Sequence, residues 1–293
     1  MTVDRASGAL RLVSDRSGPT PSTSMRESGL RGELRLGFAP RAGRTYLAQS
    51  YQAGCLRARS PRTAAGETAS VVLINTGGGV AGGDRLRQQI SWGAGAHGVV
   101  AAQAAEKVYR SLGPSSVIDT RLELASGARA EWLPQETILF DRARLVRRTE
   151  VRMAGDASFH GVEAVVLGRT AMGETMREGL LADSWRIWRD GRLIYADAQR
   201  LEGPIDALMM RASIGAGARA MAVLIHVSAQ AGRYLTALRE VFANAAGRAA
   251  ASAWNGMLVA RFLAPDGQRL RADLTAALAV LRDGRAAPRV WTC

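Results

Sequence analysis

The stretch that decides the fold is Trp185-Arg186-Ile187-Trp188-Arg189-Asp190-Gly191-Arg192-Leu193-Ile194-Tyr195. Two β-prone runs flank Asp190-Gly191, a dipeptide that favours a type I′ turn because both positions tolerate positive φ. The pattern therefore predicts a β-hairpin. Similar runs bounded by turn residues recur at short intervals along most of the chain, which indicates a mostly β protein.

Six other segments are predicted to be strands. Apolar and polar residues alternate over 118–124 and 149–153, and each segment ends near a turn signal, Ser126-Gly127 and Gly155-Asp156 respectively. We expect a second strand around Ala130 and Trp132, and we expect the segment that follows Asp156 to return as the partner strand of 149–153. The remaining segments are apolar runs typical of buried strands: 70–75, 159–167 and 258–263.

Helical periodicity is confined to the C-terminal part of the chain. Apolar residues at helical spacing predict helices over about 229–252 and 272–282. Residues 1–28 are rich in Ser, Thr, Pro and Gly and are predicted to form a flexible polar tail. We therefore expect a single large β-rich domain over 29–293, sandwich-like or barrel-like, with many short antiparallel strands and a few C-terminal helices.

The chain is strongly basic, but its charge is dispersed. The 293 residues include 39 Lys and Arg against 26 Asp and Glu, a formal net charge of +13, and Lys107 is the only lysine. Such a charge can indicate a nucleic-acid partner. The arginines form no dense run, however, and their excess over lysine is typical of a GC-rich genome. A basic nucleic-acid-binding β protein is therefore the less favoured alternative.

Cysteine usage and hydropathy favour a cytoplasmic protein. Cys55 and Cys293 are the only cysteines, so there is no disulfide framework. The N-terminal stretch lacks the apolar core of a signal peptide. We find no apolar run long enough to predict a membrane span.

The sharpest local motif is the glycine loop at 75–85, in which Gly77, Gly79 and Gly82 match the G-x-G-x-x-G pattern. A dinucleotide site requires a helix after this pattern, yet 86–92 has no helical stripe. Asp84 also stands where a phosphate-binding loop has lysine, which argues against a nucleotide-dependent enzyme. We interpret Gly77, Gly78, Gly79, Gly82 and Gly83 as a tight turn with several positive φ angles. Asp84 is expected to cap this turn or to bind a cation.

Blocks far beyond the glycine loop carry a family resemblance. In chain order they are 32–38, 43–47, 54–57, 75–84, 107–110, 131–141, 167–174, 187–191, 200–203 and 288–291. With these blocks, the sequence over about 30–293 resembles the urease accessory protein UreD (UreH) family. One departure is Thr76-Gly77-Gly78, where the family commonly has Pro-Gly-Gly.

The resemblance implies a non-catalytic maturation factor with a mostly β fold. Family members bind apo-urease and the F-type urease accessory protein, which carries the G-type urease GTPase. The assembly delivers nickel to the urease active site. The resemblance therefore implies no tightly bound cofactor, only nickel in transit, and no membrane partner.

A transit path for nickel requires weak ligands, and carboxylates and water suffice. The candidates are the carboxylates Asp84, Glu136, Asp141, Glu163 and Glu174 and the thiol of Cys55, for which a buried small hydrophobic side chain is the favoured interpretation. On a strand, Glu136 shares a face with Ile138 and Phe140, so either an arginine partner or a water-filled channel must offset its burial. The same two interpretations apply to Glu163 and Glu174. The histidines His97, His160 and His226 are far apart in the sequence and are interpreted as packed or surface side chains.

Overall fold

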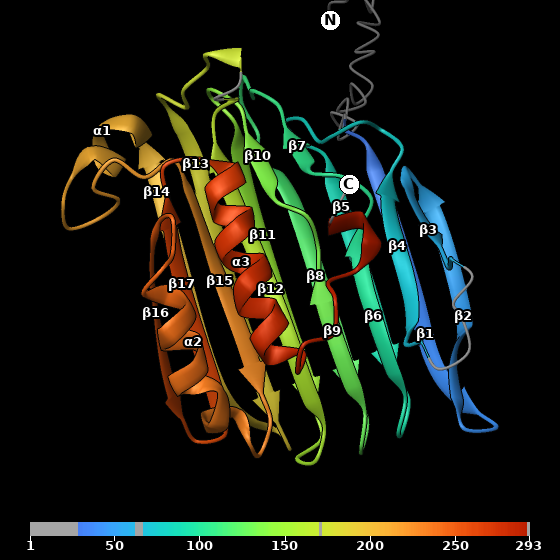
Figure 1. The fold of residues 1–293 in the computed structure, drawn as a ribbon. Helices are drawn as coiled ribbons and strands as arrows, with labels where there is room; N and C mark the ends of the chain where they lie inside the picture. The colour runs from blue at the N-terminus through green and yellow to red at the C-terminus, as the bar shows by residue number, and fades with distance from the viewer. Residues whose placement is uncertain (1–28, 62–66, 170–171, 292–293) are drawn as a thin grey trace, which may run out of the picture.

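The computed structural model describes residues 29–61, 67–169 and 172–291, which form two β-sheets facing each other, with helices on one side (Figure 1). The predicted tail over 1–28 lies outside the described residues. The mostly β prediction is confirmed. Within the described ranges, no helix is long and apolar enough to cross a membrane.

The first sheet has seven strands in the order β14-β13-β11-β8-β5-β1-β2. Their bounds are β1 Arg31–Arg41, β2 Arg44–Gly54, β5 Arg85–Trp92, β8 Ser116–Leu124, β11 Arg144–Met153, β13 Gly179–Arg189 and β14 Arg192–Gly203. The four pairings from β13 to β1 are parallel, and the two edge pairings are antiparallel.

The second sheet follows the order β16-β17-β15-β12-β9-β6-β4-β3, with β10 and β7 attached beside β12. Its bounds are β3 Leu56–Arg59, β4 Ala69–Asn75, β6 His97–Ala102, β7 Glu106–Val108, β9 Arg129–Leu133, β10 Thr137–Leu139, β12 Ser158–Leu167, β15 Ala220–Val227, β16 Arg248–Trp254 and β17 Met257–Ala264. The pairings from β4 to β12 are parallel.

The middle of the chain alternates between the two sheets, so that successive turns stack like the coils of a solenoid. The corners are in register: the Gly95 amide donates to the Ser126 carbonyl at 2.9 Å, and the Ser158 amide donates to the Ala128 carbonyl at 2.9 Å. The predicted antiparallel sandwich or barrel is therefore wrong for this region. The strand β12 does not return beside β11, because the turn at Gly155-Asp156 is a corner that leads into the other sheet.

The hairpin predicted at 185–195 is confirmed. β13 and β14 pair antiparallel, and the turn residues Asp190 and Gly191 have φ of 48° and 76°. The predicted strands over 70–75 and 258–263 are also present, as β4 and β17.

One apolar core lies between the sheets, and a second lies between the outer face of the second sheet and the two longer helices. The shortest helix packs against the first core instead, through Ile205 and Met209. The helices are α1 Ile205–Met210, α2 Leu235–Phe242 and α3 Gly267–Leu281, with short 3₁₀ segments at Ala231–Tyr234 and Arg289–Trp291. Figure 1 shows α2 and α3 on the same side of the molecule, in front of the second sheet.

The helix predicted over 229–252 is too long. The helix α2 ends at Phe242, and residues 248–252 belong to the edge strand β16. The Asp273 carboxylate of α3 accepts the Ala246 and Gly247 amides at 2.9 and 3.0 Å. These two hydrogen bonds fix the turn between α2 and β16. The second predicted helix corresponds to α3, which begins earlier, at Gly267, where Asp266 caps the Arg269 amide.

Candidate functional site: a polar cavity between the sheets

A cavity of about 190 Å³ lies between the two sheets. Its walls combine apolar residues with polar and charged residues from both sheets, and the charged ones are two carboxylates, Glu106 and Glu163, and two basic residues, Lys107 and Arg147. The polar side chains include Asn75, Gln88, Gln103, Glu106, Thr120, Gln135, Thr137, Arg147 and Glu163. The polar groups of this lining can hydrogen-bond to water or to a hydrated ion.

A buried ion-pair cluster, which we call the Arg147 triad, is built from Arg147, Glu163 and Asp183. Arg147 Nε and Nη2 donate to the Asp183 carboxylate at 3.1 and 2.5 Å. Arg147 Nη1 lies 2.6 Å from Glu163 Oε2 and also donates to Thr137 Oγ1 at 3.0 Å. The guanidinium of β11 therefore joins its neighbour β13 to β12 of the opposite sheet.

The second oxygen of Glu163 is also engaged. Trp132 Nε1 donates to Glu163 Oε1 at 3.2 Å, and Thr149 Oγ1 lies 3.5 Å from the same oxygen. Burial raises the pKa of Glu163, and the charge of Asp183 adds to this effect, while Arg147 opposes it. Glu163 is thus a carboxylate whose ionised form is only partly compensated.

Glu106 is the second carboxylate of the cavity wall. Its Oε1 accepts a hydrogen bond from Asn75 Nδ2 at 3.0 Å. Burial raises the pKa of Glu106 to about 7, although the Asn75 hydrogen bond works in the opposite direction. Two carboxyl groups with raised pKa therefore border one cavity, a pattern that is enriched at functional sites.

Gln88 supplies an oxygen without a protein partner. The side chain is buried on β5, lines the cavity, and its Oε1 has no hydrogen-bond donor. A buried acceptor of this kind is costly unless water or a ligand donates to it. The Gln88 oxygen is therefore available as an acceptor for a water molecule or a ligand in the cavity.

The glycine loop borders the cavity through Gly78 and Gly79, and the predicted tight turn is confirmed. Gly78, Gly79 and Gly83 have φ of 73°, 141° and 90°. A Cβ at Gly79 would come within 2.6 Å of the Lys107 carbonyl, so the loop packs too closely for a larger residue. Because the strand β5 follows the loop, the helix that a dinucleotide site requires is missing there.

Asp84 caps the glycine loop, as one of its two interpretations predicted. Its carboxylate accepts the Leu30 amide at 2.6 Å and the Ala81 amide at 2.7 Å. It ties the loop to the start of β1. Its cation-binding role stays a prediction.

The other sequence candidates lie apart from the cavity lining. Glu136 pairs with Arg271 at 2.5 Å, which is the arginine partner that was one of its two interpretations. Asp141 accepts the Arg177 amide at 2.8 Å, and Glu174 pairs with Arg169 at 2.7 Å. Of the six candidates, only Glu163 is among the lining residues. The assignment of all six candidates, Glu163 included, to a nickel path stays a prediction.

Cys55 is buried between the first strands and has a free thiol. Burial raises the pKa of this thiol, with smaller contributions from Glu106 and Asp84. A thiol with raised pKa is a poor metal ligand, because the thiolate is the ligating form.

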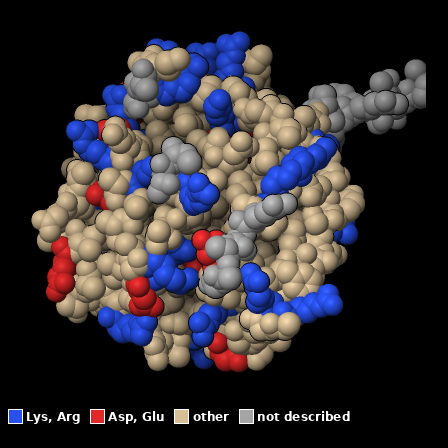
Figure 2. Space-filling model, turned by 45° about the vertical axis from the view of Figure 1, so that its right-hand side comes forward, with Lys and Arg blue, Asp and Glu red and all other residues tan. Residues whose placement is uncertain are grey.

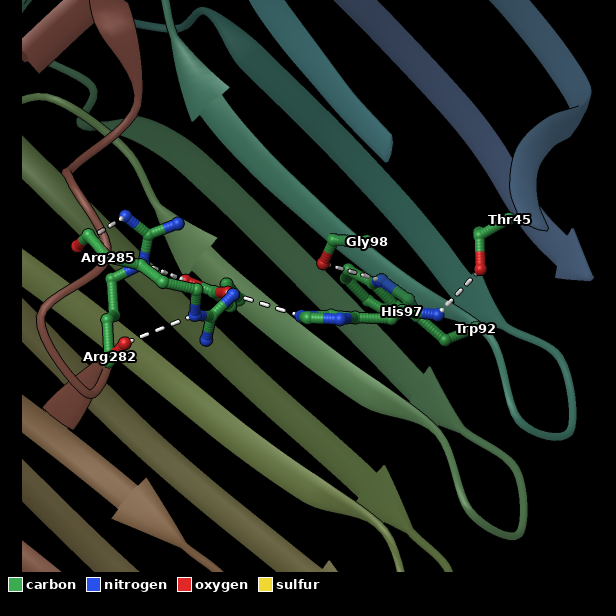
Figure 3. Close-up of polar contacts among 7 residues, drawn as sticks. Thr45, Trp92, His97, Gly98, Arg282 and Arg285 are labelled. Atoms are coloured by element: carbon green, nitrogen blue, oxygen red, sulfur yellow. Dashed lines mark hydrogen bonds and ion pairs between the residues drawn. The ribbon is translucent and has the colours of Figure 1, made fainter. Parts of the chain in front are cut away.

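A second buried ion-pair cluster, the Glu131 cluster, lies on the outer face of the second sheet. Arg282 Nε donates to Glu131 Oε2 at 2.7 Å, Arg285 Nη1 lies 3.5 Å from Oε1, and His97 Nε2 lies 3.4 Å from Oε1. Figure 3 shows Arg282 and Arg285 reaching from the C-terminal segment toward His97 on β6. The cluster fastens the segment after α3 to the sheet.

The histidines are less separated than the sequence suggested. The rings of His160 and His226 pack edge to face with centroids 4.3 Å apart on neighbouring strands. His226 is buried, and its Nδ1 lies 3.2 Å from the Phe159 carbonyl. Across the described part of the chain, no three His, Cys, Asp or Glu side chains are grouped so that they could hold a metal ion.

Sequence reasoning missed Glu106, Arg147, Asp183 and Gln88. Arg147 had a usable signal, because it occupies the inward register of β11 between Leu145 and Thr149, where a charge is out of pattern. The partners of Arg147 come from β12 and β13. Arg147 and its partners come together only because successive coils of the solenoid stack on one another, and the sequence pattern did not indicate this topology.

The surface charge is dispersed over the face that Figure 2 shows, whereas a hollow on the outer face of the first sheet brings four arginines together with Asp119 and Glu150. These arginines are Arg87, Arg121, Arg148 and Arg186. Figure 2 shows arginines scattered over the visible face, with acidic side chains among them. On the outer face of the first sheet, Arg148 pairs with Asp119 at 3.1 Å and Arg152 pairs with Glu150 at 2.6 Å. This pairing agrees with the weak case for a nucleic-acid partner.

Fold and site together define a class: a β protein with solenoid-like coils, whose two sheets enclose a polar cavity lined by carboxylates. Comparison with known proteins then identifies the family. The family model described as UreD urease accessory protein matches residues 30–292. The chain belongs to this family.

Curated relatives agree over nearly their whole length. Urease accessory protein UreD of Xanthobacter autotrophicus is 48% identical over 282 residues, covering 95% of this chain and 96% of the relative. That of Azorhizobium caulinodans is 47% identical over 260 residues, covering 89% and 95%. That of Rhizobium etli is 42% identical over 270 residues, covering 92% and 98%. The chain thus takes its place among urease accessory proteins.

Proposed function

We propose that this protein is a non-catalytic maturation factor that binds apo-urease and the F-type urease accessory protein, with the G-type urease GTPase bound through the F-type protein. We further propose that nickel ions pass through the cavity between the sheets on their way to urease. The family membership supports the first part, and the polar lining of the cavity supports the second.

The observation that carries the proposal is the oxygen-rich wall formed by Glu106, Glu163 and Gln88. Carboxylate and amide oxygens together with water are suitable ligands for a hydrated divalent cation. Glu106 and Glu163 stand on the second sheet, and Gln88 faces them from the first. An ion in the cavity would therefore meet oxygen atoms from both sides without being enclosed by a fixed ligand set.

Co-purification and metal analysis test the proposal. The full chain, expressed with apo-urease and the F-type and G-type proteins, should co-purify with urease and raise its nickel content above that of urease expressed without the chain. A folded chain that neither associates with urease nor changes its nickel content would overturn the proposed function.

The nucleic-acid alternative has a separate test. We expect the purified chain to show no retention of DNA or RNA at about 150 mM salt, because its arginines are dispersed and partly paired. Salt-sensitive binding at that ionic strength would favour the alternative.

A further inference from the structure

The Arg147 triad has an unusual position: it is a complete ion-pair cluster in the wall of the cavity. Arg147, Glu163 and Asp183 are 3%, 5% and 8% exposed. With both carboxylates ionised, two negative charges face one guanidinium, so the triad keeps one net negative charge. Arg147 and Glu163 line the cavity directly.

Each of the three guanidinium nitrogens is engaged by this arrangement. Nε and Nη2 form a two-point contact with Asp183, and Nη1 reaches both Glu163 and Thr137. Planar, two-point pairing of this kind holds arginine in a single geometry. Arg147 therefore occupies the oxygen atoms that a divalent cation would use as ligands.

We propose that Arg147 keeps the cavity a passage and prevents it from becoming a metal site, because it competes with a divalent cation for the carboxylates of Glu163 and Asp183. This inference rests on the proposed function, and it names the residue that sets how long nickel stays. The fixed positive charge keeps the net negative charge at the triad small. A cation is attracted to the wall but acquires no complete ligand set.

The alternative is a purely structural role, in which the triad only joins the sheets. The two roles differ in the nickel binding that they predict for a variant without the guanidinium. Glu163 and Asp183 would then be two buried carboxylates beside the hydroxyls of Thr137 and Thr149. Hard oxygen ligands in this number suit a divalent cation, so the competition hypothesis predicts that a metal site is unmasked.

Equilibrium dialysis of the purified full chain against nickel chloride at pH 7.5 tests this inference. We expect Arg147→Gln to bind nickel at least about tenfold more tightly than the wild-type protein, with close to one additional ion per chain. Adding Glu163→Gln to this variant should abolish the gain. A structural role would leave nickel affinity unchanged.

Arg148→Gln is the matched control. Arg148 is the next residue of β11, its side chain is 59% exposed, and it pairs with Asp119 on the outer face of the sheet. The Arg148→Gln substitution removes the same charge from the same strand as Arg147→Gln. Equal gains in nickel affinity in the two variants would therefore overturn the inference. Nickel binding by Arg147→Gln no tighter than wild type would do the same.

Circular dichroism and thermal unfolding establish that each variant is folded. If Arg147→Gln does not fold, Arg147→Lys decides the question, since an ammonium cannot make the two-point contact with Asp183 and therefore leaves carboxylate oxygens that the guanidinium had occupied. It should bind nickel more tightly than wild type, and unchanged affinity would refute the competition. Because dialysis involves no urease, a failure of this test leaves the urease experiment standing, and the reverse also holds.

Discussion

The two buried ion-pair clusters are both built from arginine and carboxylate side chains, but their net charges have opposite signs. The Arg147 triad sets two carboxylates against one guanidinium, whereas the Glu131 cluster sets one carboxylate against Arg282 and Arg285. The first borders a cavity, and the second lies beneath the C-terminal segment. In the proposed function, the acidic excess of the Arg147 triad borders the passage for the cation. The basic excess of the Glu131 cluster holds the C-terminal segment on the sheet.

The pKa values of the two glutamates follow this difference. Burial raises the pKa of Glu163. Burial also acts to raise the pKa of Glu131, but the His97 hydrogen bond and the charges of His160, Arg282 and Arg285 outweigh it and lower that pKa to about 2. Ionisation of Glu131 therefore stabilises the folded protein. Ionisation of Glu163 destabilises it, but the ionised carboxylate carries the negative charge that a metal ligand needs.

The largest effect is expected at Glu131. Glu131→Gln leaves the buried Arg282 without its charge partner, so we expect a loss of about 3–5 kcal/mol in the free energy of unfolding, measured with urea. Because the folded pKa of Glu131 is lowered, this contribution is present above about pH 4.5 and is lost as pH falls toward 2. A loss below about 1 kcal/mol would break the comparison.

The next effect is a pH dependence that belongs to Glu106. Its folded pKa of about 7 exceeds its ordinary value of 4.5, so its ionisation destabilises the fold as pH rises from about 4.5 through 7. The stability difference between Glu106→Gln and wild type should shift by about 3 kcal/mol in favour of the variant between pH 4.5 and pH 8. A stability difference that does not change with pH would show that the pKa of Glu106 is not raised in the folded protein.

A smaller effect is expected at Glu136, whose carboxylate pairs with Arg271 in a partly exposed setting. Glu136→Gln should cost about 1 kcal/mol in urea unfolding. If nickel passes only through the cavity, urease matured with this variant keeps its normal nickel content, because Glu136 is not among the lining residues. A fall in nickel content with the complex intact would return Glu136 to the path that its sequence context suggested.

The smallest effect is expected on the outer face of the first sheet. Arg148→Gln removes an exposed ion pair and should change stability by less than about 0.5 kcal/mol. Thermal unfolding checks this. A larger loss would mean that the surface pairs contribute to the fold as the buried clusters do.

Local chemistry made the hairpin and the glycine turn predictable. Asp190-Gly191 specifies a turn by its own conformational preferences, and Gly78 and Gly79 do the same. Alternation also located the strands β8 and β11. It could not assign their neighbours, since a corner such as Gly155-Asp156 uses the same residue types as a hairpin turn.

The site was predictable only in part for the same reason. Glu163 stood out because a carboxylate interrupts an apolar strand. Its partners Arg147 and Asp183 lie on strands whose proximity follows from parallel coils spanning the two sheets. The end of α2 was misjudged because the alanines of β16 are compatible with a helix, and pairing with β17 overrides that preference.

The most direct test of the account is the nickel content of urease matured with Glu163→Gln, compared with Glu150→Gln, whose side chain pairs with Arg152 on the outer face. The complex should assemble in both cases. The account predicts nickel-poor, weakly active urease with Glu163→Gln and normal nickel content with Glu150→Gln. Full nickel content with the Glu163 variant, or equal losses with both, would contradict passage through the cavity.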